Sequence, residues 1–250
     1  MDTIAPILTN NANASSRLLL ICDHARNDMP SGYNSLGLSD VELERHIAYD
    51  IGAESLTSQL STRLDATAIL CCYSRLLVDP NRGEDDPTLI VSASDGTVIP
   101  GNVSIDDKER ERRLDLFYRP YHSVITNLID ERLAAGRPPL IASIHSFTPH
   151  WNDRLRRWHV GVLWDKDPVS ARRLIDGLNA DPELIVGDNE PYSGATPLNS
   201  TLNAHAALRG LSHVLIEVRQ ELIAEEAGVE AWADRLTPIF LSLLGERKPV

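Results

Sequence analysis

The chain has 250 residues, of which 42% are hydrophobic and 24% charged, so it is long enough to bury a sizeable core in one large domain. Its 36 acidic and 24 basic side chains give a net charge of −12, which disfavours nucleic acid and anionic membranes as partners. The sequence shows no C-x-x-C pair, no signal-like leader and no apolar run of membrane-spanning length. We expect one cytoplasmic domain over residues 1–250, with residues 1–15 loosely ordered. Its partner would be a small molecule, and the sequence leaves open a monomer or a homo-oligomer.

Short apolar runs alternate along the chain with longer segments that have helical spacing. The runs predict buried strands at Arg17–Cys22, Thr67–Tyr73, Pro139–Ile144, His159–Trp164 and His213–Val218. The spacing predicts helices at about Ser39–Arg63, Asp106–Ala135, Pro168–Asn179, Asn199–Leu208 and Gln220–Leu244. Because the strands are continuously hydrophobic and helices lie between them, we predict an α/β fold whose mostly parallel sheet is covered on both faces.

Polar side chains that suit catalysis or ligand binding follow the predicted strands. In open α/β sheets the ligand site lies beyond the carboxyl ends of the strands. His24 and Arg75 come shortly after the first two runs, His145 directly follows the third, and Glu217 lies at the end of the last. These residue types suit metal binding, anion binding and proton transfer, so we expect the site at this edge of the sheet.

His24 and His145 are candidate metal ligands. Both follow an apolar strand, and a parallel sheet would bring them to the same edge. Two imidazoles, one carboxylate and an open position make a common catalytic zinc site. The alternative is that each histidine only hydrogen-bonds a backbone carbonyl at the end of its strand.

The third metal ligand has several candidates. If residues 39–63 form one helix, Glu44 shares the sector that the helix buries, and an inward-facing carboxylate needs a partner. His46 and Asp50, four residues apart, could instead form a carboxylate–histidine pair that orients a ligand or only supports the helix. Asp28 is the acidic residue nearest to His24 in this direction along the chain and remains a competitor.

Asn81 and Arg82 lie in the segment Asp79-Pro80-Asn81-Arg82, early in a long polar connection. An arginine fork with an adjacent amide suits a substrate carboxylate. Alternatively, the segment is only a turn in which Asp79 pairs with Arg82. For the arginines at positions 154, 156 and 157 we expect a solvated loop with one or two internal ion pairs rather than an anion site.

Glu217 and Tyr192 complete the set of candidate residues. Glu217 is either an inward carboxylate at the end of a central strand or the partner of Arg219. An inward glutamate beside an activated water acts as general base and then protonates a leaving nitrogen. Tyr192 is either a hydrogen-bond donor on a substrate loop or a ring packed in a Pro-Tyr-Ser-Gly turn.

Six motifs taken together resemble those of the N-formylglutamate amidohydrolase family. They are His24-Ala-Arg-Asn-Asp-Met-Pro30, His46-Ile-Ala-Tyr-Asp50-Ile-Gly52, Ser74-Arg-Leu-Leu-Val-Asp79-Pro-Asn81-Arg82, Ser143-Ile-His145-Ser146-Phe-Thr148-Pro149, Asn189-Glu-Pro-Tyr192-Ser193 and Ile216-Glu217-Val-Arg219-Gln-Glu-Leu222. The resemblance runs from about residue 17 to residue 245. It implies a three-layer α/β/α sandwich with a mostly parallel mixed sheet, similar to zinc carboxypeptidases and aspartoacylase-like hydrolases.

The resemblance also implies roles for single residues. His24 and His145 would hold one divalent metal, with zinc as the expected ion, and Glu217 would be the general base. The carboxypeptidase pattern has a glutamate three residues after its first histidine, but this chain has Asn27 there. We therefore take Glu44, just ahead of His46, as the expected third ligand.

The substrate residues follow from the same resemblance. Asn81 and Arg82 would clamp the α-carboxylate, and Tyr192 would line the substrate loop. Arg75 or Arg219 would meet a side-chain carboxylate or the developing oxyanion.

The resulting hypothesis is a metal-dependent amidohydrolase that removes a small acyl group, such as formyl, from an acidic amino acid such as glutamate. Two alternatives remain. One is another N-acyl amino acid deacylase or carboxypeptidase of the same fold, and the other is a carboxylate-binding module without catalytic activity.

Overall fold

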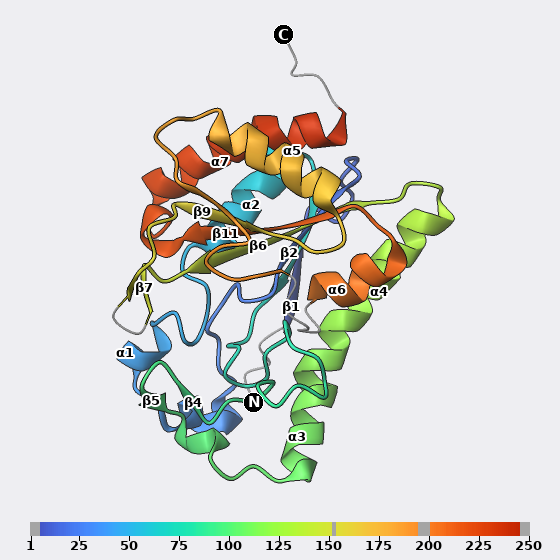
Figure 1. Ribbon diagram of the computed structural model, residues 1–250. Helices are drawn as coiled ribbons and strands as arrows, with labels where there is room; N and C mark the ends of the chain where they lie inside the picture. The colour runs from blue at the N-terminus through green and yellow to red at the C-terminus, as the bar shows by residue number, and fades with distance from the viewer. Residues whose placement is uncertain (1–5, 152–153, 195–200, 246–250) are drawn as a thin grey trace.

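A seven-stranded sheet forms the centre of the protein in the computed structural model (Figure 1). The structure describes residues 6–151, 154–194 and 201–245. The sheet strands are β1 (Ile7–Asn10), β2 (Leu18–Cys22), β3 (Thr67–Cys71), β6 (Leu140–Phe147), β9 (Val160–Leu163), β10 (Val186–Asp188) and β11 (His213–Arg219). Two short hairpins are β4 (Ala93–Ser94) with β5 (Thr97–Val98), and β7 (His150–Trp151) with β8 (Arg154–Leu155).

The sheet order is β1-β3-β2-β6-β11-β9-β10. Strands β3, β2, β6 and β11 run parallel to one another, whereas β1 is antiparallel to β3 and β9 is antiparallel to β11. The four central strands are almost wholly buried, which agrees with the continuous hydrophobicity of their sequences. Their carboxyl ends therefore lie at one edge of the sheet.

Helices cover both faces of the sheet. The helical elements are η1 (Ser31–Gly37), α1 (Asp40–Leu43), α2 (Ala53–Arg63), η2 (Pro100–Asn102), α3 (Asp107–Arg113), η3 (Leu114–Tyr118), α4 (Arg119–Ala134), α5 (Pro168–Asn179), α6 (Thr201–His205), η4 (Ala207–Arg209), η5 (Gln220–Leu222) and α7 (Glu226–Leu244). Helices α2, α5 and α7 pack on one face in one apolar cluster. Helix α4 and the segments around α1 and α6 cover the other face in a second cluster. The predicted three-layer α/β fold is confirmed.

Three differences between the predicted and the observed elements concern the sheet and the site. All five predicted strands are present, but β1 and β10 were not predicted, because each is short and lies at an edge of the sheet. Strand β1 also orders part of the segment that we expected to be loose, while residues 1–5 lie outside the described chain. The helix expected from Asn199 begins, within the described residues, at Thr201.

The third difference matters for the site. The expected helix over residues 39–63 is two helices, α1 and α2, separated by an irregular segment from Glu44 to Gly52. A capping box between Ser39 and Glu42 starts α1, and the chain leaves the helix at Glu44. Gly52 has a φ of 80° at the start of α2, a left-handed conformation that glycine adopts without strain. The helical sectors assigned to residues 44–50 therefore do not apply.

Candidate metal centre and substrate cavity

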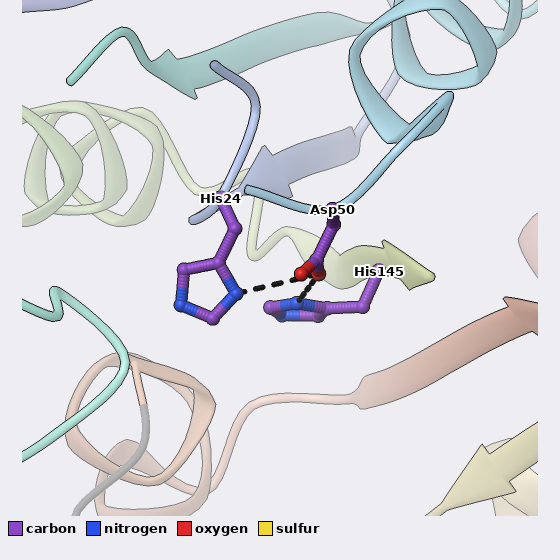
Figure 2. A group of neighbouring side chains, drawn as sticks. All are labelled: His24, Asp50 and His145. Carbon is purple, nitrogen blue, oxygen red and sulfur yellow. Dashed lines mark hydrogen bonds and ion pairs between the residues drawn. The ribbon is translucent and has the colours of Figure 1, made fainter. Parts of the chain in front are cut away.

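His24, Asp50 and His145 form a buried cluster at the carboxyl edge of the sheet (Figure 2). One ligand atom from each residue lies within 4.8 Å of the other two. The Asp50 Oδ2 atom is 2.7 Å from His145 Nδ1 and 3.3 Å from His24 Nδ1. The two ring centroids are 5.0 Å apart. The structure thus brings the two predicted histidines together.

The fold explains how three distant segments meet. His24 follows β2, and His145 lies near the end of the neighbouring parallel strand β6. Asp50 comes from the irregular segment before α2, where its backbone N–H donates to the carbonyl of His24 at 2.9 Å. The N–H of Ser146 also donates to Asp50 Oδ2, at 3.3 Å. Backbone contacts therefore fix the carboxylate between the imidazoles.

Each imidazole has a second carboxylate behind it. His24 Nε2 lies 2.7 Å from Asp79 Oδ1, and His145 Nε2 lies 3.2 Å from Asp23 Oδ2. Both rings thus turn Nδ1 toward Asp50 and Nε2 toward an outer aspartate. Such carboxylates orient histidine ligands and make them more basic.

The outer aspartates are themselves held by buried groups. The Arg75 guanidinium donates to Asp79 Oδ2 at 2.6 Å, and the N–H of Asn81 donates to Asp79 Oδ1 at 2.9 Å. Asp23 Oδ1 accepts hydrogen bonds from the hydroxyls of Tyr121, at 2.9 Å, and Thr201, at 2.7 Å. These hydrogen bonds hold both outer aspartates in place behind the imidazoles.

The buried charges shift the pKa values of the cluster. Burial alone would lower the pKa of His145, but its hydrogen bonds to Asp23 and Asp50 outweigh burial and raise the pKa well above its usual value. Burial opposes ionisation of Asp50, yet the two histidines hold the pKa of this carboxyl below its usual range. The site thus favours an ionised Asp50.

Glu217 faces the cluster from β11. It pairs directly with His145 in the parallel register of β11 and β6, and only 8% of its surface is exposed. Within the described residues, its Oε2 atom is buried without a hydrogen-bond partner. Burial raises the pKa of Glu217 to about 7, although the nearby histidines oppose this shift. A carboxyl of this kind can exchange a proton near neutral pH.

The donor set fits a divalent metal. Two imidazole nitrogens and one carboxylate oxygen converge, and each histidine has an outer carboxylate. The buried Glu217 oxygen beside them has no hydrogen-bond partner among the residues that the structure describes. Three protein ligands of these types, with room for a further ligand, are typical of catalytic zinc. The predicted metal centre is thus compatible with the side chains present.

A cavity of about 1010 Å³ opens onto the cluster. Its lining includes His24, Asp50, His145 and Glu217. The surrounding wall contributes Arg75, Asn81, Arg82, Trp151, Trp164 and Tyr192. The predicted substrate residues Asn81, Arg82 and Tyr192 therefore share one cavity with the predicted metal ligands.

The arginines of the site differ in their partners. Arg75 is bound to Asp79 and lies 3.6 Å from Asp50, so its charge is already paired. Arg82 donates to the Thr88 hydroxyl and the Asn81 carbonyl, and forms no ion pair with any carboxylate that the structure describes. The suggested Asp79–Arg82 pair is not formed. Arg219 pairs with Glu221 and is not part of the cavity lining.

The structure does not bring Glu44 to the histidines. Its side chain is exposed and accepts hydrogen bonds from Asn27 and Tyr49. The inward orientation expected for Glu44 required a continuous helix, and α1 has already ended at this point. Asp28 lies outside the cluster, beside Arg26. His46 lines the cavity but faces Asp95 and the ring of Trp151.

Asp50 takes the place beside the histidines instead. The sequence suggested Asp50 only as part of a pair with His46 that orients a ligand or supports the helix, and Asp23 and Asp79 were not assigned to the histidines. An acidic residue in the apolar segment Ile47-Ala-Tyr-Asp50-Ile51, just ahead of Gly52, was the available signal. A carboxylate in an apolar segment is expected to be buried, and a buried carboxylate needs a hydrogen-bonded, cationic or metallic partner.

A search of the described residues finds no helix with the length and apolar character needed to cross a membrane.

Comparisons with known proteins show relatives that share this fold. The chain is 36% identical to gene product Atu2144 from Agrobacterium tumefaciens, whose crystal structure superposes with a TM-score of 0.92 over 96% of this chain and 95% of that one. The crystal structure of N-formylglutamate amidohydrolase from Ralstonia eutropha JMP134 shares the fold, with a TM-score of 0.76, 18% identity and coverage of 97% and 98% of the two chains.

A curated relative matches over a shorter stretch. It is the N-formylglutamate deformylase of Pseudomonas putida, 28% identical over 127 residues, which is 44% of this chain. The match spans about half, 48%, of that relative's length. The profile of the family described as N-formylglutamate amidohydrolase matches residues 16–224. The chain belongs to the N-formylglutamate amidohydrolase family.

Proposed function

We propose that this protein is a metal-dependent amidohydrolase that hydrolyses an N-acyl, and in particular an N-formyl, derivative of an acidic amino acid. Family membership supports the amide-hydrolase class. The observation that carries the proposal is the cluster of His24, Asp50 and His145 beside the buried Glu217 oxygen, which has no hydrogen-bond partner in the described part of the chain. N-Formylglutamate would yield formate and glutamate, with one water consumed.

His24 and His145 would bind the metal through their Nδ1 atoms, and Asp50 would bind it through a carboxylate oxygen. Zinc is the expected ion. A divalent ion held by this set supplies Lewis acidity toward the acyl carbonyl and the attacking water. Asp79 and Asp23 keep the two rings in orientation through their Nε2 atoms.

Glu217 would move the proton. Its buried Oε2 would take a proton from the attacking water and afterwards deliver it to the leaving nitrogen. A pKa of about 7, raised by burial, lets one carboxyl act as base and then as acid at neutral pH.

Arg82 would bind the α-carboxylate of the substrate. Its guanidinium lines the cavity and has no carboxylate partner among the described residues. Asn81 Oδ1 accepts from the N–H of Thr201 at 3.0 Å, which orients the side-chain amide. Tyr192 would donate to another substrate oxygen. The roles of Arg75 and Arg219 toward the oxyanion, and the cytoplasmic location, stay predictions.

The test combines metal analysis with turnover by the full chain. We expect about one divalent ion per chain and release of equal amounts of formate and glutamate from N-formylglutamate. Glu217→Gln should abolish turnover and retain the metal, because the amide cannot accept the proton and does not belong to the donor set. Normal hydrolysis by this variant would contradict the assignment of the base.

Substrate profiling tests the acyl group. Ligand pockets range from about 300 to 1,000 Å³, so a cavity of about 1010 Å³ has room for acyl groups larger than formyl. N-formyl, N-acetyl and N-succinyl glutamate, together with dipeptides, should be compared by kcat/KM. A preference for larger acyl groups or peptides would favour a different deacylase or a carboxypeptidase. Glutamate binding without bound metal or turnover would favour the non-catalytic module.

A further inference from the structure

Arg156 is a buried cation beside the cavity. Its residue surface is 8% exposed, whereas Arg154 and Arg157 are exposed. The expectation of a solvated loop is therefore wrong for Arg156. Across the part of the chain that the structure describes, no carboxylate forms an ion pair with this guanidinium. A buried charge without a counter-ion is costly and needs another source of stabilisation.

Aromatic rings surround the Arg156 guanidinium. Its central carbon lies 4.6 Å from the ring centroid of Tyr192, 5.3 Å from that of Trp151 and 6.0 Å from that of Phe147. Arginine over aromatic faces is attracted by the ring electrons, more strongly when water is excluded. The backbone N–H of Arg156 donates to the Pro149 carbonyl at 2.8 Å. These contacts hold the guanidinium in one place.

The hydrogen bond from Arg156 to Tyr192 determines what the phenol can do. Arg156 Nη1 donates to the Tyr192 hydroxyl oxygen at 2.8 Å. Because a guanidinium only donates, the phenol oxygen is the acceptor here and its own proton points elsewhere. Tyr192 lines the same cavity as His145 and Glu217. Its hydroxyl is therefore set up as a donor toward that cavity.

The backbone before Tyr192 is fixed as well. A Cβ atom on Gly161 of β9 would lie 2.0 Å from the carbonyl oxygen of Glu190. Only glycine lets the segment 190–192 approach the sheet so closely. The close approach at Gly161 thus fixes the backbone just before Tyr192, and Arg156 holds the Tyr192 hydroxyl.

We infer that Arg156 is a positioning residue that orients the Tyr192 hydroxyl as a hydrogen-bond donor to an oxygen of the bound N-acyl amino acid. The inference rests on the proposed function, because Tyr192 must touch substrate. Arg156 itself is not part of the cavity lining and acts through Tyr192.

A double-mutant cycle on the full metal-loaded protein tests the inference. Arg156→Met keeps an apolar stem but removes the donor, and Tyr192→Phe keeps the ring but removes the hydroxyl. We expect each variant to raise KM for the N-acyl amino acid about 10-fold, with kcat changed less than about threefold. Both variants weaken or remove the hydrogen bond from the Tyr192 hydroxyl to the substrate, and hydrogen bonds to charged groups are strong. The double variant should show no more than the larger single effect.

Two further variants distinguish positioning from general damage. Arg156→Lys retains a charged donor and should recover most of the lost affinity. Arg157→Met changes an exposed neighbour, stacked on Trp158, and should leave KM unchanged. Independent, multiplying effects of Arg156→Met and Tyr192→Phe would overturn the inference, as would an unchanged KM in Arg156→Met. If Arg156→Met does not fold, Arg156→Leu takes its place in the cycle, because it also removes the donor to Tyr192.

The same cycle can be run without turnover. Calorimetry gives the Kd of glutamate and of N-formylglutamate for each variant. If the wild-type protein binds these ligands but hydrolyses no N-acyl amino acid, the proposed function fails while the cycle on Kd still decides the role of Arg156. Equal Kd values for wild type, Arg156→Met and Tyr192→Phe would overturn the role of Arg156.

Discussion

Glu217 and His145 occupy directly opposite positions on the parallel strands β11 and β6. Side chains at opposite positions of a parallel pair project from the same face of the sheet, so the register alone brings the carboxyl beside the imidazole. His145 faces Asp50 through Nδ1 at 2.7 Å. The proposed base and His145, one of the three proposed metal ligands, are therefore held by the same two hydrogen-bonded strands.

The first prediction concerns the third ligand. Asp50→Ala should lose the metal and reduce kcat/KM at least 100-fold, because it removes the carboxylate between the imidazoles. Glu44→Ala should retain both the metal and the activity, since its exposed side chain accepts hydrogen bonds from Asn27 and Tyr49 and lies outside the ligand cluster. Elemental analysis after dialysis checks the difference. Loss of metal in Glu44→Ala with retention in Asp50→Ala would reverse the assignment.

The second prediction concerns the outer carboxylate of His24. Asp79→Asn keeps the side-chain shape but weakens the contact to His24 Nε2 and the ion pair with Arg75. Loss of such an orienting group typically costs about 10- to 100-fold in metal affinity or activity, and we expect this range. Competition with a chelator measures the affinity.

Asp28→Asn is the control for this change. Asp28 is partly exposed beside Arg26 and is outside the ligand cluster. Equal metal affinities for Asp79→Asn and wild type would contradict the role of Asp79.

The third prediction concerns the substrate carboxylate. Arg82→Met should raise KM at least 10-fold with a smaller change in kcat, because a bidentate charge-assisted contact is lost. Arg82→Lys should recover only part of the affinity, since an ammonium lacks the planar fork. Arg172→Met, at an exposed ion pair with Asp188, is the control. Steady-state kinetics with N-formylglutamate measures these changes. An unchanged KM in Arg82→Met would contradict the binding of the α-carboxylate by Arg82.

The fourth prediction is a pH dependence of stability that arises away from the metal centre. His122 Nδ1 and His205 Nε2 lie 2.7 Å apart in a stacked pair. Burial, with a contribution from His122, lowers the pKa of His205 to about 4. In the unfolded chain this histidine takes up a proton near pH 6.5. Between about pH 6.5 and pH 4 the unfolded chain therefore binds more protons than the folded chain. Stability contributed by neutral His205 is therefore present above pH 6.5 and is lost as the pH falls toward 4.

Urea unfolding between pH 7 and pH 4.5 measures this dependence. The loss attributable to His205 should be about 2 to 3 kcal/mol across the window. In His205→Gln the free energy of unfolding should fall less between pH 7 and pH 4.5, by that amount. In the control His150→Gln, at an exposed position, it should fall as in the wild type. Identical slopes for wild type and His205→Gln would show that the pair does not titrate as described.

Much of the fold and part of the site follow from the sequence. Continuous apolar runs predicted five of the strands in the central sheet, β2, β3, β6, β9 and β11, because strands buried on both faces are rich in hydrophobic side chains. The ends of these strands then indicated His24, His145 and Glu217, and the cavity contains all three. The sequence by itself determined the layers of the fold and these candidates.

Tertiary structure decided the remaining groups. Asp50 lies beside the histidines because the chain leaves α1 at Glu44 and is tied to His24 by a backbone hydrogen bond, and helical periodicity cannot anticipate such a break. Arg156 and Tyr192 are 36 residues apart, and only the packing of their segments brings them together. Local patterns specify which face of an element is buried, whereas contacts between irregular segments depend on the whole fold.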